Sequence, residues 1–154
     1  MNKRLTVIIA GILSGVLLAA CGKDSGISEF KNEIDDFCTR ISEIDTSINN
    51  IDAQSENAKT YLLDYLKELD TEFQEFAVLD FPEEYDYLEQ LADEAATYMT
   101  EATSGYVSAY SDGYNETMGE YAKENYVRAY KRVQIIITFL HGEEPENVNL
   151  SMED

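Results

Sequence analysis

The stretch FKNEIDDFCTRISEIDTSI, residues 30–48, predicts the architecture of this chain. Its large apolar side chains recur every three or four residues, at Phe30, Ile34, Phe37, Ile41, Ile44 and Ile48, and Ile51 continues the series. This alternation places them on one face of an α-helix, with the spacing of a seam between bundled helices. Neither Gly nor Pro occurs from Ile27 to Phe81, so a break in this helix needs another cause.

The polar cluster from Asn49 to Asn57 provides that cause. Asn, Asp and Ser side chains compete for backbone hydrogen bonds, so we place a turn near Asp52–Ser55. Three more segments with helical periodicity follow the turn. Their apolar faces consist of Ala58, Leu62, Tyr65, Leu69, Phe73 and Phe76 in the second helix, of Leu88, Leu91, Ala95, Tyr98, Ala102, Tyr106 and Ala109 in the third, and of Met118, Ala122, Tyr126, Ala129, Val133, Ile136 and Leu140 in the fourth.

The boundaries of the later helices follow from Pro, Gly and Asn. Pro82 with its following acids is typical of a first helical turn, so we expect the third helix to begin there. We expect it to stop at Asp112–Gly113, and the fourth to run from near Asn115 to His141–Gly142. Helices of similar length, about 40 Å, with short connections predict an all-α, antiparallel up-down four-helix bundle over residues 28–142. The alternative is a three-helix bundle in which the first two segments fuse.

The positions of the turns also predict which residues face each other. A reversal near residue 53 sets three pairs opposite one another: Ile44 and Leu62, Ile41 and Tyr65, and Phe37 and Leu69. A reversal near Gly113 sets Glu94 opposite Arg132 and places Glu101 within a turn of Arg128. We therefore expect the basic residues of the fourth helix to form internal ion pairs that fix the register, rather than an anion-binding site.

The first 20 residues have the pattern of a signal peptide. Lys3 and Arg4 precede the uncharged run LTVIIAGILSGVLLAA, residues 5–20, which is too short to span a bilayer stably and ends in small residues. The sequence Leu18-Ala19-Ala20-Cys21-Gly22 resembles the lipobox of bacterial lipoproteins. That resemblance implies cleavage before Cys21, a diacylglyceryl group on its sulfur and acylation of the new amino terminus. The alternative is an ordinary signal peptide or anchor helix with an incidental Cys.

Lipidation at Cys21 would place the mature protein on the extracytoplasmic face of the cell membrane. Two or three acyl chains anchor a protein stably, whereas one is marginal. Residues 21–27 then form the lipidated Cys and a tether. The tail, residues 143–154, is acidic and lacks apolar periodicity, so we expect it to be disordered.

The charge of the chain excludes one class of partner. Its 11 Lys and Arg residues stand against 31 Asp and Glu residues, a formal net charge of −20. Nucleic acids are bound through basic surfaces, so we expect no nucleic-acid partner. An anionic membrane surface repels such a domain, which leaves the lipid as its means of attachment.

Two segments also resemble known sequences. FPEEYDYLEQLADEAATYMTEA, residues 81–102, and ENYVRAYKRVQIIITFLHGEEPENV, residues 124–148, are similar to uncharacterised helical lipoproteins of gut Firmicutes. The resemblance implies the compartment and the bundle, and it brings no activity or site residue with it.

The residue types needed for most catalytic and metal sites are scarce. The chain has one His and two Cys, too few for a di-iron bundle site, covalent haem or structural zinc. We expect His141 to cap the fourth helix and Cys38 to be a half-buried, unreactive thiol. We therefore expect no cofactor, no bound metal and no enzymatic activity.

Tyrosines form the most suggestive pattern for function. Tyr106, Tyr110, Tyr114 and Tyr121 surround the predicted turn between the third and fourth helices. Tyr offers rigid amphipathic contact area, so this end is our candidate contact surface, although such rings can also simply fill the seam. The sequence predicts a non-catalytic, lipid-anchored protein-interaction module. The alternative is a ligand-capture lipoprotein that binds a cationic or glycan solute near the same end.

Overall fold

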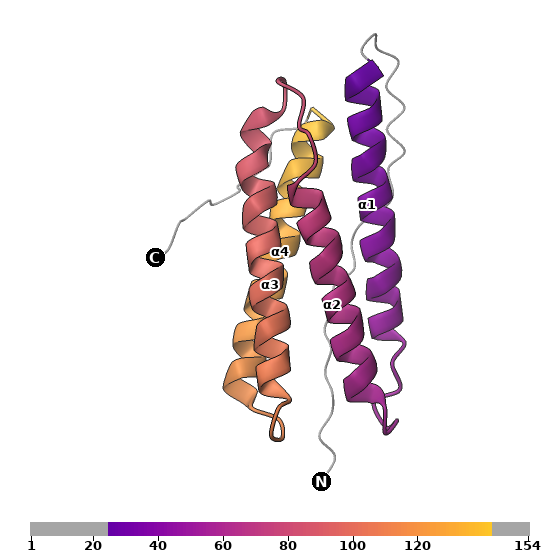
Figure 1. The fold of residues 1–154 in the computed structure, drawn as a ribbon, viewed down its shortest axis with the longest axis vertical. Coiled ribbons are helices and arrows are strands. Elements are labelled where there is room, and N and C mark those ends of the chain that lie inside the picture. The colour runs from indigo at the N-terminus through magenta and orange to yellow at the C-terminus, as the bar shows by residue number, and fades with distance from the viewer. Residues whose placement is uncertain (1–24, 143–154) are drawn as a thin grey trace.

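The computed structural model describes residues 25–142; the predicted signal peptide, Cys21 and the acidic tail lie outside the described residues. Within this range the chain forms the α-helices α1 (Ser25–Asn49), α2 (Ala58–Ala77), α3 (Glu89–Ala109) and α4 (Glu116–Leu140), and the short 3₁₀-helix η1 (Asp86–Leu88). The four long helices lie side by side, and the chain reverses direction at each connection (Figure 1). An all-α four-helix bundle is thereby confirmed. The fused three-helix alternative is wrong, because residues 50–57 leave the helix.

The predicted seams form the core. All six positions of α1 from Phe30 to Ile48 are buried, as the spacing predicts, and Ile51 is half-buried. Aromatic rings fill the space between α1 and α2, where Phe37 stacks on Phe76 with ring centroids 4.3 Å apart. Ring stacking of this kind adds to the stabilisation that burial of the side chains gives. Among the described helices, none has the length and apolar composition needed to cross a bilayer.

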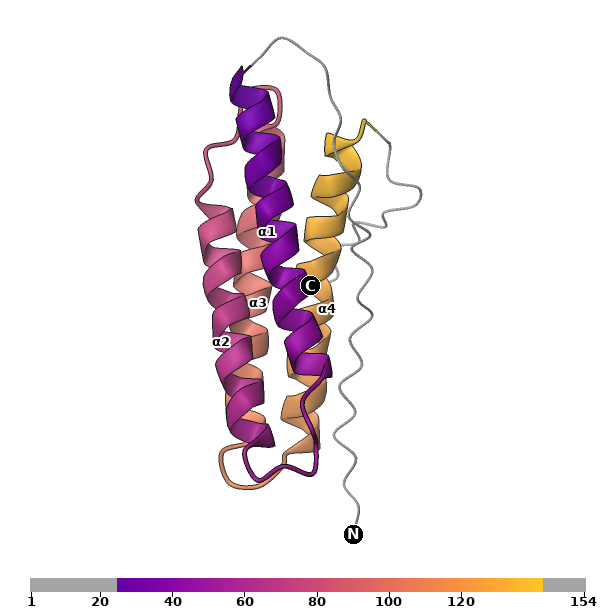
Figure 2. The ribbon, with the colours of Figure 1, turned by 90° about the vertical axis from the view of Figure 1, so that its right-hand side faces the viewer.

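Helices α3 and α4 approach each other most closely, because small residues face one another between them. A Cβ atom added to Gly105 would lie 2.9 Å from the Cβ of Ala122. Ala92, Ala95, Ala96 and Ala102 of α3 and Ala129 of α4 are also buried. Figure 2 shows α1 and α4 from the side, with α3 behind α1.

The third helix begins later than predicted. Pro82 does not occupy its first turn; α3 begins at Glu89, after turns and η1. The reason is burial of the connection itself: Phe81 and Tyr85 pack on Phe30, with ring centroids 4.8 and 6.0 Å from that ring. These aromatic residues close the end of the core at which α1 begins.

The register of the first hairpin also differs from the prediction. Phe37 packs on Phe73 and Phe76, four and seven residues beyond its predicted partner Leu69. Arg40 donates to Glu72 across the same interface, with Nε and Oε2 2.5 Å apart. The point at which the chain reverses therefore lies closer to α2 than the predicted residue 53, because the connection occupies all of residues 50–57. The start of α1 also differs from the prediction: the helix begins at Ser25, three residues before residue 28, the predicted start of the bundle.

The second hairpin has the predicted register. Arg132 donates to Glu94, with Nε and Oε2 2.6 Å apart. Arg128 faces α3 as expected, but it lies over the ring of Tyr98 instead of beside Glu101, which accepts a hydrogen bond from Tyr121. Arg128 and Arg132 are thus used within the bundle, and the anion-site alternative loses its support.

Candidate functional site

The tyrosine-rich end comprises Tyr106, Tyr110, Tyr114 and Tyr121, at the connection between α3 and α4. The connection between α1 and α2 lies at the same end of the bundle (Figure 1). Lys59, at the start of α2, joins the two by donating to the carbonyl of Tyr110. The structure therefore brings the predicted tyrosines together and adds α2 to their surroundings.

Local backbone features position Tyr114. Gly113 has a φ of +96°, a conformation that residues with a Cβ rarely adopt, and it allows the chain to turn. Asn115 then caps α4, because its side-chain oxygen accepts from the N–H of Met118 at 3.1 Å. Between these two residues, Tyr114 lies over Gly119: a Cβ added there would be 2.2 Å from the Tyr114 hydroxyl oxygen.

The four rings divide into two half-buried and two exposed members. Burial raises the pKa of Tyr106 and of Tyr110 to about 12, so both phenols stay protonated at neutral pH. Tyr114 and Tyr121 are 47% and 45% exposed. The Tyr110 and Tyr114 rings lie 5.1 Å apart, so half-buried Tyr110 supports exposed Tyr114.

Exposed apolar side chains concentrate at this end. Among the described residues, the exposed large hydrophobic side chains are Tyr61, Val78, Tyr87, Val107, Tyr114, Tyr121 and Val127. Four of these seven lie at the tyrosine-rich end: Tyr61 in the first turns of α2, Val107 near the end of α3, Tyr114 in the connection between α3 and α4, and Tyr121 in the first turns of α4. Such clustering of apolar surface is typical of interaction sites.

The tyrosine-rich end is also acidic. Segments 50–61 and 101–123 together contain six acidic and two basic residues, a net charge of −4. One of the two basic residues, Lys59, is held by the carbonyl of Tyr110, and the other is Lys123. Tyr121 donates to the carboxylate of Glu101 at 3.0 Å, which fixes a ring and a negative charge side by side.

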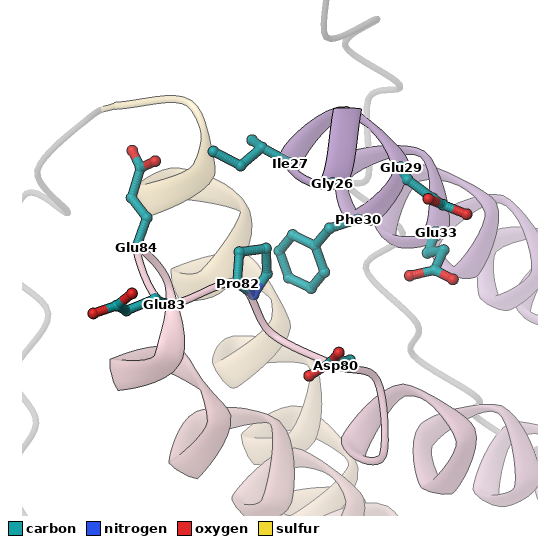
Figure 3. A pocket seen from close by; sticks show the side chains of 9 residues that line it. All are labelled: Gly26, Ile27, Glu29, Phe30, Glu33, Asp80, Pro82, Glu83 and Glu84. Atoms are coloured by element: carbon teal, nitrogen blue, oxygen red, sulfur yellow. The ribbon is translucent and has the colours of Figure 1, made fainter. Parts of the chain in front are cut away.

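A cavity lies at the opposite end, between the start of α1 and the connection after α2. It has a volume of about 750 Å³ and is lined by Gly26, Ile27, Glu29, Phe30, Glu33, Asp80, Pro82, Glu83 and Glu84. The rings of Phe30 and Pro82 lie next to each other there, and the carboxylates of Glu83 and Glu84 point away from them (Figure 3). This cavity is remote from the tyrosines, so it does not supply the pocket that the ligand-capture alternative places among them.

A buried polar contact that sequence reasoning missed links α1 to α4. Asp45 is 5% exposed and accepts a hydrogen bond from the hydroxyl of Tyr126. Burial raises the pKa of Asp45, and the hydrogen bond from Tyr126 opposes that rise. The signal was present, since Asp45 lies four residues after Ile41 and three before Ile48, on the predicted seam.

His141 and Cys38, the other two residues considered in the sequence analysis, both make contacts that are structural. His141 follows α4, and its backbone N–H bonds to Ile137 at 3.1 Å. Lys31 of α1 supplies a cation at the same helix end, donating to the carbonyl of Leu140 at 3.3 Å. Burial, together with nearby Asp35, raises the pKa of Cys38 to about 12, so its thiol is protonated at neutral pH.

In the part of the chain that the structure describes, no three His, Cys, Asp or Glu side chains are placed to hold a metal ion. Comparisons with protein-family models, characterised proteins and solved structures found no match. Function must therefore be inferred from the residues of this chain.

Proposed function

We propose that this protein is a lipid-anchored, non-catalytic interaction module of the bacterial cell envelope, attached through Cys21 and contacting a protein partner through its tyrosine-rich end. The observation that carries the proposal is the arrangement of the two ends. Helix α1, which begins at Ser25, starts at one end of the bundle, and the connection between α3 and α4, where the tyrosines lie, is at the other end (Figure 1).

The dimensions of the chain support this arrangement. The four residues before Ser25 reach at most about 14 Å when fully extended, so a lipid on Cys21 holds the Ser25 end near the bilayer. Helix α1 has 25 residues, which at 1.5 Å per residue extend about 37 Å. The tyrosine-rich end can thus project well beyond the headgroups, and the acidic charge of the domain keeps it from lying on an anionic surface.

Exposure at this end favours contact with a protein. Tyr114 and Tyr121 each expose close to half of their surface, although burying these rings in the core would stabilise the fold more. Exposed tyrosines supported by packed neighbours are typical anchors in protein interfaces.

The lipid anchor is tested by metabolic labelling with a fatty-acid probe. The wild type should be labelled and should fractionate with membranes, whereas Cys21→Ala should carry no label. Cys38→Ala is the matched control, because it removes the other cysteine and should leave labelling unchanged. Equal labelling of Cys21→Ala and the wild type would refute lipidation.

The contact surface is tested in intact cells with a photo-crosslinking phenylalanine placed at Tyr121 or at Tyr87. Both side chains are exposed, to 45% and 55%. Tyr87 belongs to η1, just before α3, and Tyr121 lies in the first turns of α4, after α3 has run the length of the bundle. We expect a discrete crosslinked product from position 121 and none from position 87. Identical products from both positions, or none from 121, would contradict the proposal.

A further inference from the structure

We propose that the tyrosine-rich end binds a cationic partner segment, with Arg side chains of the partner stacking on Tyr121 and Tyr114 and pairing with Glu101. This inference rests on the proposed function and adds the chemistry of the partner to it.

The bundle already contains the arrangement that we infer for the partner. Arg132 and Arg128 of α4 lie over the ring of Tyr98, with guanidinium carbons 5.4 and 5.7 Å from its centroid. Arg132 also pairs with Glu94, one turn before Tyr98 on α3. A ring face and a carboxylate together thus hold guanidinium groups of the same chain, by attraction to the ring quadrupole and to the negative charge.

The same two groups recur at the tyrosine-rich end. The hydroxyl of Tyr121 donates to Glu101, so a ring and a carboxylate lie side by side here as well, joined in this case by a hydrogen bond between α4 and α3. Tyr121 is 45% exposed, and among the described cation–π contacts none involves its ring. Tyr114, 47% exposed, offers a second ring at the same end.

Charge complementarity selects a basic occupant. From Glu101 to Ala122 the sequence contains four acidic residues and neither Lys nor Arg. The negative potential of this surface attracts a basic segment and repels an acidic one. Glu101, Asp112, Glu116 and Glu120 supply the negative charge.

The test uses the full-length chain in detergent and a synthetic peptide of alternating Arg and Gly residues. Signals of ring-labelled tyrosines are followed by NMR during the titration. We expect the Tyr114 and Tyr121 signals to shift at lower peptide concentration than that of Tyr87. Tyr121→Leu should weaken binding about two- to fivefold, the range for an exposed cation–π contact.

Two further variants separate this site from general attraction to an acidic protein. Glu101→Gln should weaken binding by up to about fivefold, whereas Tyr87→Leu should leave it unchanged. Because Tyr121 is half exposed, Leu at this position should preserve the fold, which the helical circular dichroism signal verifies. A peptide with Glu in place of Arg should not bind.

Equal shifts of the Tyr87 and Tyr121 signals, or unchanged affinity of Tyr121→Leu, would overturn the inference, since the peptide would then follow net charge alone. If position 121 still crosslinks in cells, that result would leave the contact surface intact and refute only its basic partner. If position 121 gives no crosslinked product, the proposed contact surface fails as well.

Discussion

Replacing Gly105 by Ala should destabilise the bundle, although Ala is the better helix former. The added Cβ would lie 2.9 Å from the Cβ and 3.2 Å from the Cα of Ala122. Both of these atoms are fixed to the backbone of α4, so the two helices must move apart. Overpacking of this kind costs about 1–3 kcal/mol. The higher helix propensity of Ala returns about 1 kcal/mol, which leaves a net loss of about 0–2 kcal/mol.

Gly119→Ala is the matched comparison, because this glycine is also buried in a helix and also faces a close neighbour. Its added Cβ would meet the hydroxyl oxygen of Tyr114 at 2.2 Å. That atom is the far end of a side chain that is 47% exposed and free to rotate into solvent. We expect Gly119→Ala to be between about 0 and 1 kcal/mol more stable than the wild type.

Urea denaturation followed by circular dichroism measures both variants. With a denaturant dependence of about 1–3 kcal/mol per molar, a loss of 1 kcal/mol lowers the midpoint by about 0.3–1 M. Combining Gly105→Ala with Ala122→Gly removes the clash between the Cβ atoms and should recover most of the loss. The reasoning is refuted if Gly105→Ala gains as much stability as Gly119→Ala, or if the double variant recovers nothing.

Three further predictions concern the core and its polar contacts. Leu69→Ala should lower the free energy of unfolding by about 2–5 kcal/mol, because Leu69 is fully buried; a loss below 1 kcal/mol in urea denaturation would contradict this. The Glu94–Arg132 pair should show a coupling of about 0–1 kcal/mol in a double-mutant cycle, since both side chains keep partial solvent access, and the coupling should shrink in high salt. Burial raises the pKa of Asp45 above its unfolded value, so its contribution to stability is complete below the unfolded pKa and is lost as pH rises through the folded pKa. Asp45→Asn keeps an acceptor for Tyr126, and its stability relative to the wild type should therefore be greater near neutral pH than in acid; an advantage that stays constant with pH would disprove the role of the Asp45 charge.

The apolar faces of the helices were predictable because a helix with one buried face has an apolar residue at every third or fourth position, and this spacing is visible in the sequence. In α1 every apolar position from Phe30 to Ile48 is buried, since a helix with one apolar face has one low-energy way to pack it. The Glu94–Arg132 register was predictable for a related reason: the turn at Gly113 is short, and a short turn restricts which residues can face each other.

The misplaced start of α3 shows where local rules fail. Pro82 followed by acids is a good first helical turn by local criteria, but Phe81 and Tyr85 bury their rings against Phe30. Their contact with a residue some 50 positions earlier outweighs a local helical preference, because burying a large aromatic side chain contributes about 1.5–3 kcal/mol. The position of Asp45 on the seam of α1 is visible in the sequence, but its partner Tyr126 lies 81 positions away, and no local pattern identifies it.

The two glycines near the tyrosine-rich end, Gly105 and Gly119, have different roles: the first allows two helices to pack, and the second makes room for a side chain on the surface. Gly in a helix costs up to about 1 kcal/mol relative to Ala, so each needs a reason. Gly105 has one in the interior, where α4 leaves no room for a Cβ. Gly119 has none in the core: the atoms its Cβ would meet belong to Tyr114, whose ring remains close to half exposed. What Gly119 provides is room for the Tyr114 ring to lie against α4, which the proposed contact surface uses and the stability of the bundle does not require.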